Sequence, residues 1–304
     1  MLLKKNIPIK YVFSKIKYEL VFITVYAIVV GFIDKHLQLN NISVATGVPM
    51  ILGTIISLLL AFRSNQAYDR WWEARIIWGA IVNDSRSLAR IVLSFIEDRD
   101  FSVEKHNFKE RFVKRQIAWA YSLGNALRNQ NPLKNVNNLL SEKDINIVSQ
   151  YDNVPNALLF LHSMDIKYAY EKQWINSYQQ VEIETTLSRL CDSLGKCERI
   201  KNTVFPTTYS MYINFTLWIF ILVFPFALTS YFGLFEIPLM IAISSALLLI
   251  EKMAIHLQDP FENKPTDIPV TAIALNIEKN LRHMLNETPQ PVVPKSSVND
   301  FYLM

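Results

Sequence analysis

Two long stretches of this sequence contain no Asp, Glu, Lys, Arg or His, and they limit what the chain can fold into. They are Val44–Phe62 and Met211–Phe235. A helix needs about 20 apolar residues to cross the hydrocarbon core of a bilayer, and both stretches are close to that length or longer. A buried core helix explains one isolated apolar stretch, but it explains less well two stretches that each have another apolar run nearby. The sequence therefore predicts a membrane protein.

Two shorter apolar runs, Leu20–Ile33 and Ile237–Ile250, lie beside the long ones. Each reaches the length of a span only with its flanking residues. A secretory signal peptide is a weaker interpretation of the first run, because the charged segment Asp34–Leu37 follows it in place of a small-residue cleavage site. We expect an all-α membrane protein of one domain, 1–304. Its predicted parts are spans at about 18–36, 44–62, 210–232 and 235–255, a cytoplasmic helical region at 63–209 and a cytoplasmic tail at 256–304.

The lysines outside the spans predict the orientation of the chain. Five lie before the first predicted span, whereas the connector at residues 34–43 has Lys35 alone and the connector around Gly233 has no Lys or Arg. Because Lys and Arg are retained on the cytoplasmic side, both termini and the region 63–209 are expected in the cytoplasm.

The region 63–209 is predicted to be helical and to bind no nucleic acid. It has 20 Lys and Arg against 17 Asp and Glu, which is typical of a solvated surface of mixed charge. Aromatic and aliphatic residues recur at helical intervals over Asn65–Ile96. Further helices are expected at Phe101–Asn129, Ala157–Lys172 and Trp174–Leu194, the last ending near Gly195, with a loop or a short helix at Lys134–Asn153.

The sequence lacks the motifs of common catalytic and metal sites. Its two cysteines, Cys191 and Cys197, are not spaced as a CxxC pair, and its five histidines show no HxxxH or HExxH spacing. No glycine-rich phosphate loop, GxSxG or DxDxDG motif is present. We therefore expect no enzyme activity, no metal and no cofactor, and we expect both thiols to be buried and reduced.

One segment directly after the second apolar run carries a resemblance. The run from Phe62 to Arg75 reads FRSNQAYDRWWEAR, and its tryptophans and arginines are typical of an anchor at the membrane surface. FRxNxxYDRWWEAR resembles the signature of the bestrophin family, specifically its bacterial branch. Cys197–Pro206 and Asp259–Asn263 resemble two further family segments in the same order. The signature residues are Arg63, Asn65, Tyr68, Asp69, Arg70, Trp71, Trp72, Glu73 and Arg75.

The resemblance implies a homopentameric ion channel in the lipid bilayer, with the second span of each subunit lining a narrow neck. Carried over to this sequence, the neck residues are Thr54, Leu58 and Phe62, and a spacing of four places them on one helix face. Rings of Leu and Phe offer no groups that replace ion hydration, so the neck is predicted to close by dewetting. The resemblance also assigns a second, cytoplasmic aperture to Phe205.

Several alternatives stay open at the level of sequence. Thr54 supplies either a ring of hydroxyl groups or a hydroxyl bonded to its own helix. The loop Glu262–Asp267 has Lys264 in place of an acidic run, so calcium activation is not expected. The bacterial branch favours a monovalent cation, Na⁺ or K⁺, with chloride as the alternative. A membrane-tethered scaffold or binding protein is the alternative of a different class.

Overall fold

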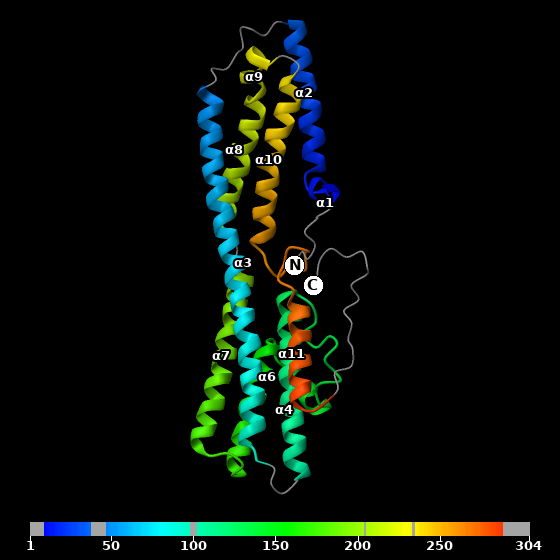
Figure 1. The fold of residues 1–304 in the computed structure, drawn as a ribbon, viewed down its shortest axis with the longest axis vertical. Coiled ribbons are helices and arrows are strands. Elements are labelled where there is room, and N and C mark those ends of the chain that lie inside the picture. The colour runs from blue at the N-terminus through cyan, green and yellow to red at the C-terminus, as the bar shows by residue number, and fades with distance from the viewer. Residues whose placement is uncertain (1–8, 38–46, 98–101, 204, 233–234, 288–304) are drawn as a thin grey trace. The chain divides into compact units, whose positions relative to one another are not determined.

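The computed structural model describes residues 9–37, 47–97, 102–203, 205–232 and 235–287 (Figure 1). Within these ranges the regular secondary structure is α-helical, as predicted. The described chain divides into two compact units. Residues 9–71 and 205–259 form the first, here called the apolar unit, and residues 72–203 and 260–287 form the second, here called the bundle unit. The single domain over 1–304 stays a prediction.

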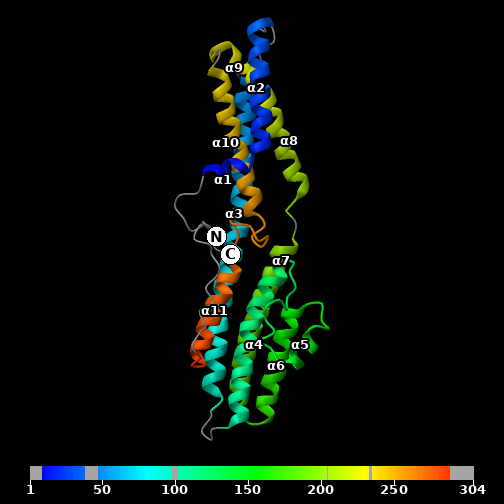
Figure 2. The ribbon, with the colours of Figure 1, turned by 90° about the vertical axis from the view of Figure 1, so that its right-hand side faces the viewer.

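The apolar unit is built from helices that carry the predicted spans. Helix α10 packs against α2, α8 and α9 (Figure 1 and Figure 2). Buried aliphatic and aromatic side chains from α2, α3, α8 and α10 form its core, among them Ile23, Leu60, Leu217 and Met240. The elements are α1 (Ile9–Ser14), α2 (Lys17–Leu37), the first half of α3 (Gly47–Phe95), α8 (Thr207–Val223), α9 (Pro225–Phe232) and α10 (Glu236–Leu257).

Three segments of the described chain are long and apolar enough to cross a membrane. They lie in α3, in Thr207–Leu228 and in α10, and so they coincide with the second, third and fourth predicted spans. The first predicted span coincides with the 21-residue helix α2, which is not among the three. The count of four spans therefore stays a prediction. Of the predicted connector at residues 34–43, residues 34–37 belong to α2 and residues 38–43 lie outside the described residues.

The third predicted span is interrupted, contrary to expectation. Helix α8 ends at Val223 and α9 begins at Pro225. Proline has no N–H to donate and its ring crowds the preceding turn, so a break at this position is the expected consequence. The lack of charged side chains predicted a span, but it did not indicate whether that span is a single helix or is broken into two.

The bundle unit is a set of long helices packed side by side. Helix α4 packs against α6, α7 and α11, and α6 also packs against α5 and α7 (Figure 1 and Figure 2). Trp78, Phe112 and Trp119 are fully buried in its core. The elements are the second half of α3, α4 (Val103–Leu127), α5 (Glu142–Val148), α6 (Val154–Glu171), α7 (Ser177–Asn202) and α11 (Val270–Met284).

Most predicted helices of the bundle unit are confirmed, but two boundaries were wrong and one helix was missed. The second span and the helix at Asn65–Ile96 are one continuous helix, α3. Helix α7 runs through Gly195, because an isolated glycine costs only about 1 kcal/mol and a capping box of Asn176 and Gln179 stabilises the start of the helix. Helix α11 was not predicted within the tail 256–304. The stretch left open as loop or short helix contains the short helix α5.

Candidate pore-lining site

The predicted neck residues lie on a face of α3 that the rest of the apolar unit does not cover. Thr54 is exposed, and the side chains of Leu58 and Phe62 are 57% and 55% exposed. The Thr54 hydroxyl donates a hydrogen bond to the Met50 carbonyl at 2.9 Å. Of the two alternatives for Thr54, the structure therefore contains the hydroxyl bonded to its own helix.

The opposite face of α3 anchors the helix in the core of the apolar unit. Ile56 and Leu60 are buried there with Leu217 and Ile221 of α8. Gly53 allows a close approach of α8, because a Cβ at this position would lie 3.3 Å from the Phe220 ring. Apolar burial on one face therefore fixes which face of α3 is exposed.

Arg63, the residue after Phe62, points into the unit and not along the exposed face. Its Nη1 lies 3.4 Å from Oε1 of Glu251 on α10, and its Nη2 donates to the Ser210 hydroxyl at 3.1 Å. Both charged side chains are buried. This pair was not predicted, because its partners lie 188 positions apart along the chain.

The other signature residues do not converge on one cluster. Arg70 forms an ion pair with Asp259 at 3.9 Å, and the rings of Tyr68 and Trp71 stack with centres 6.2 Å apart. In the bundle unit, Glu73 forms an ion pair with Arg199. The remaining signature side chains, Asn65, Asp69, Trp72 and Arg75, are exposed.

Phe205, predicted at a cytoplasmic aperture, lies in the apolar unit. Its half-buried ring lies 5.9 Å from the guanidinium carbon of Arg63 and 6.1 Å from the ring centre of Tyr209. A guanidinium over an aromatic face is a favourable cation–π contact. In the single chain Phe205 therefore packs against Arg63, and its place at an aperture stays a prediction.

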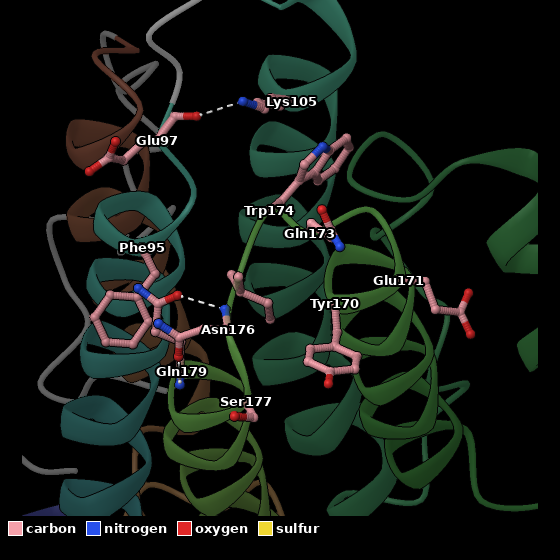
Figure 3. A pocket seen from close by; sticks show the side chains of 11 residues that line it. Phe95, Glu97, Lys105, Tyr170, Glu171, Gln173, Trp174, Asn176, Ser177 and Gln179 are labelled. Atoms are coloured by element: carbon pink, nitrogen blue, oxygen red, sulfur yellow. Dashed lines mark hydrogen bonds between the residues drawn. The ribbon is translucent and has the colours of Figure 1, made fainter.

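Two cavities in the described parts of the chain, one in each unit, were not predicted from the sequence. The cavity of the apolar unit has a volume of about 720 Å³ and lies beside the exposed face of α3, with Gly53, Thr54 and Ser57 in its wall. The cavity of the bundle unit has a volume of about 780 Å³ and lies where α6 meets α7 (Figure 3). Its lining includes Phe95, Glu97, Lys105, Tyr170, Glu171, Gln173, Trp174, Asn176, Ser177 and Gln179.

The bundle unit also has a buried polar core that the sequence did not predict. Arg115 of α4 donates to Oδ2 of Asp144 at 2.9 Å from Nη2, to Oδ2 of Asp165 at 2.6 Å and to the Leu161 carbonyl at 3.2 Å. His162 is fully buried beside them. Burial and then the charge of Arg115 hold the pKa of His162 well below its usual value.

The expectation for the two thiols was half wrong. Cys197 is buried, and burial raises the pKa of its thiol to about 12. Cys191 is exposed, because it lies on the outer face of α7. Both cysteines are free thiols.

The loop after α10 uses its carboxylates for contacts within the protein. Glu262 forms an ion pair with Lys201 at 2.7 Å, and this contact lowers the pKa of Glu262. The buried carboxylate of Asp267 accepts a hydrogen bond from the Lys264 N–H at 3.0 Å. Among the residues that the structure describes, no three His, Cys, Asp or Glu side chains are placed to hold a metal ion.

Comparison with known proteins gives a consistent result. The family model described as bacterial/fungal bestrophin protein matches residues 8–283. A voltage-dependent anion channel-forming protein of Nostoc sp. is 30% identical over 244 residues, covering 79% of each chain. Another of that name from Escherichia coli K12 is 28% identical over 280 residues, covering 92% of this chain and 90% of the relative.

A solved structure shows the same similarity in three dimensions. The crystal structure of a bacterial bestrophin homologue from Klebsiella pneumoniae is 26% identical and superposes with a TM-score of 0.84. The match covers 90% of this chain and 100% of that chain.

Proposed function

This chain belongs to the bacterial and fungal bestrophin family, and from that membership we propose that it is an ion channel and not an enzyme. The family model matches nearly the whole chain, and its relatives are named channel-forming proteins. Three described segments long and apolar enough to cross a membrane support a multi-pass protein. Its place is the bacterial inner membrane, with both termini cytoplasmic, as the distribution of lysines predicts.

The exposed face of α3 is the observation that carries the proposal. Leu58 and Phe62 are 57% and 55% exposed on this face, so in the single chain their side chains are free to line a surface shared with other copies. In a homopentamer, five copies of Thr54, Leu58 and Phe62 form stacked rings around a neck. The Leu58 and Phe62 rings close the neck by dewetting, and Phe205 forms a second apolar ring at the cytoplasmic aperture.

Chloride or another monovalent anion is the favoured ion. The relatives are named voltage-dependent anion channel-forming proteins, which supports the anion alternative over the cation predicted from the bacterial branch. Reversal potentials of the reconstituted channel under a KCl gradient and a NaCl gradient test this choice. A reversal potential near the equilibrium potential of K⁺ in the KCl gradient, or of Na⁺ in the NaCl gradient, contradicts the anion proposal.

The gate is tested by the double substitution Leu58→Ala and Phe62→Ala in planar bilayers. Removing both rings widens and wets the neck, so the open probability is expected to rise. The matched control is Phe22→Ala with Val25→Ala, which removes one aromatic and one aliphatic side chain from exposed positions on α2. An unchanged open probability in the neck variant, or an equal rise in the control, contradicts the hydrophobic gate.

The assembly and its calcium response have separate tests. A mass near five chains of 35.2 kDa supports the channel, whereas a monomer supports the membrane-tethered scaffold or binding protein. Calcium activation through the loop after α10 is not expected, because Lys201 already pairs with Glu262 and a backbone N–H already bonds Asp267. Opening of the purified channel by submicromolar Ca²⁺ contradicts that expectation.

A further inference from the structure

The apolar unit contains a buried ion pair directly behind the proposed gate. Arg63 follows Phe62 on α3 and is 2% exposed, and Glu251 on α10 is 3% exposed. Their Nη1 and Oε1 atoms lie 3.4 Å apart. Moving a charge out of water is costly unless a partner compensates it, so each of these two groups depends on the other.

Nearby charges pair elsewhere and leave Glu251 to neutralise Arg63. Lys252, the neighbour of Glu251, forms an ion pair with Glu19 of α2 at 2.8 Å. Among the residues that the structure describes, the Arg63 guanidinium also contacts the neutral Ser210 hydroxyl and the Phe205 ring. The charge of Arg63 is therefore cancelled chiefly by one carboxylate.

The position of the pair relates it to ion passage. Successive residues of a helix are turned by about 100°, so the exposed Phe62 faces away from the unit while Arg63 faces into it. In an assembly whose neck is lined by Phe62, each Arg63 follows a Phe62 of the ring by one residue. Its guanidinium lies on the side of α3 that faces the core of its own unit. The neck itself contributes no charged side chain at Thr54, Leu58 or Phe62, so the nearest buried charge has the largest influence on a passing ion.

We propose that Glu251 sets the ion selectivity of the neck by cancelling the positive charge of Arg63 behind the Phe62 ring. This inference rests on the proposed channel function. Removing the carboxylate charge leaves one positive charge per subunit at the cytoplasmic end of the neck and favours anions. Removing the guanidinium charge instead leaves a carboxylate and favours cations.

The size of the effect follows from Coulomb's law. One unit charge lies about 10 Å from an ion in the neck, in a medium with an effective dielectric constant of about 40. At that distance it changes the probability of finding the ion there about fourfold. Anions and cations respond in opposite directions, so the chloride-to-potassium permeability ratio is expected to rise at least about fourfold in Glu251→Gln and to fall by a similar factor in Arg63→Gln.

The experiment measures reversal potentials of the full-length channel in planar bilayers under a KCl gradient. Glu251→Gln keeps the side-chain shape and an acceptor oxygen. The control is Glu19→Gln, which breaks the Lys252 ion pair in the same unit without freeing Arg63. The double variant Arg63→Gln with Glu251→Gln restores neutrality, so its permeability ratio is expected to return toward that of the wild type.

The direction in which the permeability ratio changes separates an electrostatic role of the ion pair from a purely stabilising role. A pair that only stabilises the fold predicts no opposite shifts in the two single variants and no recovery in the double variant. An unchanged ratio in Glu251→Gln, or an equal shift in Glu19→Gln, overturns the inference. If Glu251→Gln does not assemble, a shift toward anions in Arg63→Gln overturns it. A wild-type protein that conducts no ion overturns the proposed function instead.

Discussion

Replacing Arg115 by leucine is expected to destabilise the bundle unit strongly. Arg115 is 2% exposed and donates to Asp144, Asp165 and the Leu161 carbonyl. In Arg115→Leu, Asp165 keeps the Arg111 guanidinium at 2.9 Å, but Asp144 loses both of its hydrogen bonds from Arg115. A buried charge left without its partner costs about 3–5 kcal/mol.

The assay is thermal unfolding of the purified full-length protein in detergent, followed by circular dichroism. For a chain of this size 1 kcal/mol corresponds to about 2 °C in Tm, so Arg115→Leu is expected to lower Tm by roughly 6–10 °C. The matched control is Arg111→Leu, because Arg111 bonds the same Asp165 from a side chain that is 44% exposed. A surface pair of that kind contributes about 0–1 kcal/mol, or at most about 2 °C.

A second variant separates lost charge compensation from lost packing. Arg115→Leu with Asp144→Leu removes both charges of the pair, and replacing a buried pair by apolar side chains is often neutral. The double variant is therefore expected to recover most of the lost Tm. If Arg115→Leu lowers Tm no more than Arg111→Leu does, or if the double variant is no better than the single one, the reasoning is wrong.

Three further outcomes are expected at other sites. Burial lowers the pKa of His162, so below about pH 6.5 the unfolded chain takes up a proton that the folded chain does not. The free energy of unfolding therefore falls as pH drops, by at most about 1.4 kcal/mol per pH unit. His162→Phe is expected to flatten the profile of Tm against pH between about pH 6.5 and 5. A maleimide at pH 7 is expected to label one thiol per native chain, because Cys191 is exposed while Cys197 is buried with a pKa of about 12. Cys191→Ser is expected to abolish the labelling. Rapid labelling of two thiols per native chain contradicts the buried state of Cys197. Gly53→Leu is expected to cost about 1–3 kcal/mol in unfolding experiments, since its Cβ would lie 3.3 Å from the Phe220 ring, and an unchanged Tm is the contrary result.

Several features could be predicted from the sequence because they depend on residues close together in the chain. The apolar run Ile237–Ile250 with its flanks predicted α10 at nearly its observed position, and the helices expected at Phe101–Asn129 and Ala157–Lys172 lie close to α4 and α6. The signature that begins at Phe62 indicated the family, which the match over residues 8–283 establishes.

Other features could not be predicted because they depend on neighbours far apart in the chain. Whether Cys191 is exposed depends on which face of α7 is packed, and the amphipathic α11 was missed within a segment interpreted as a tail. The boundary predicted between the second span and the helix at Asn65–Ile96 was wrong, because hydropathy changes there while α3 continues.

By itself the sequence determined the helical class, the apolar segments and the family, since hydropathy and motif spacing are local properties. Only the tertiary structure decided which partner each buried charge meets. Glu251 lies 188 positions from Arg63, and Asp144 lies 29 positions from Arg115. A buried charge requires compensation by an opposite charge or by hydrogen bonds. The residue that supplies the compensation depends on how the helices pack, and packing brings together residues that the sequence keeps apart.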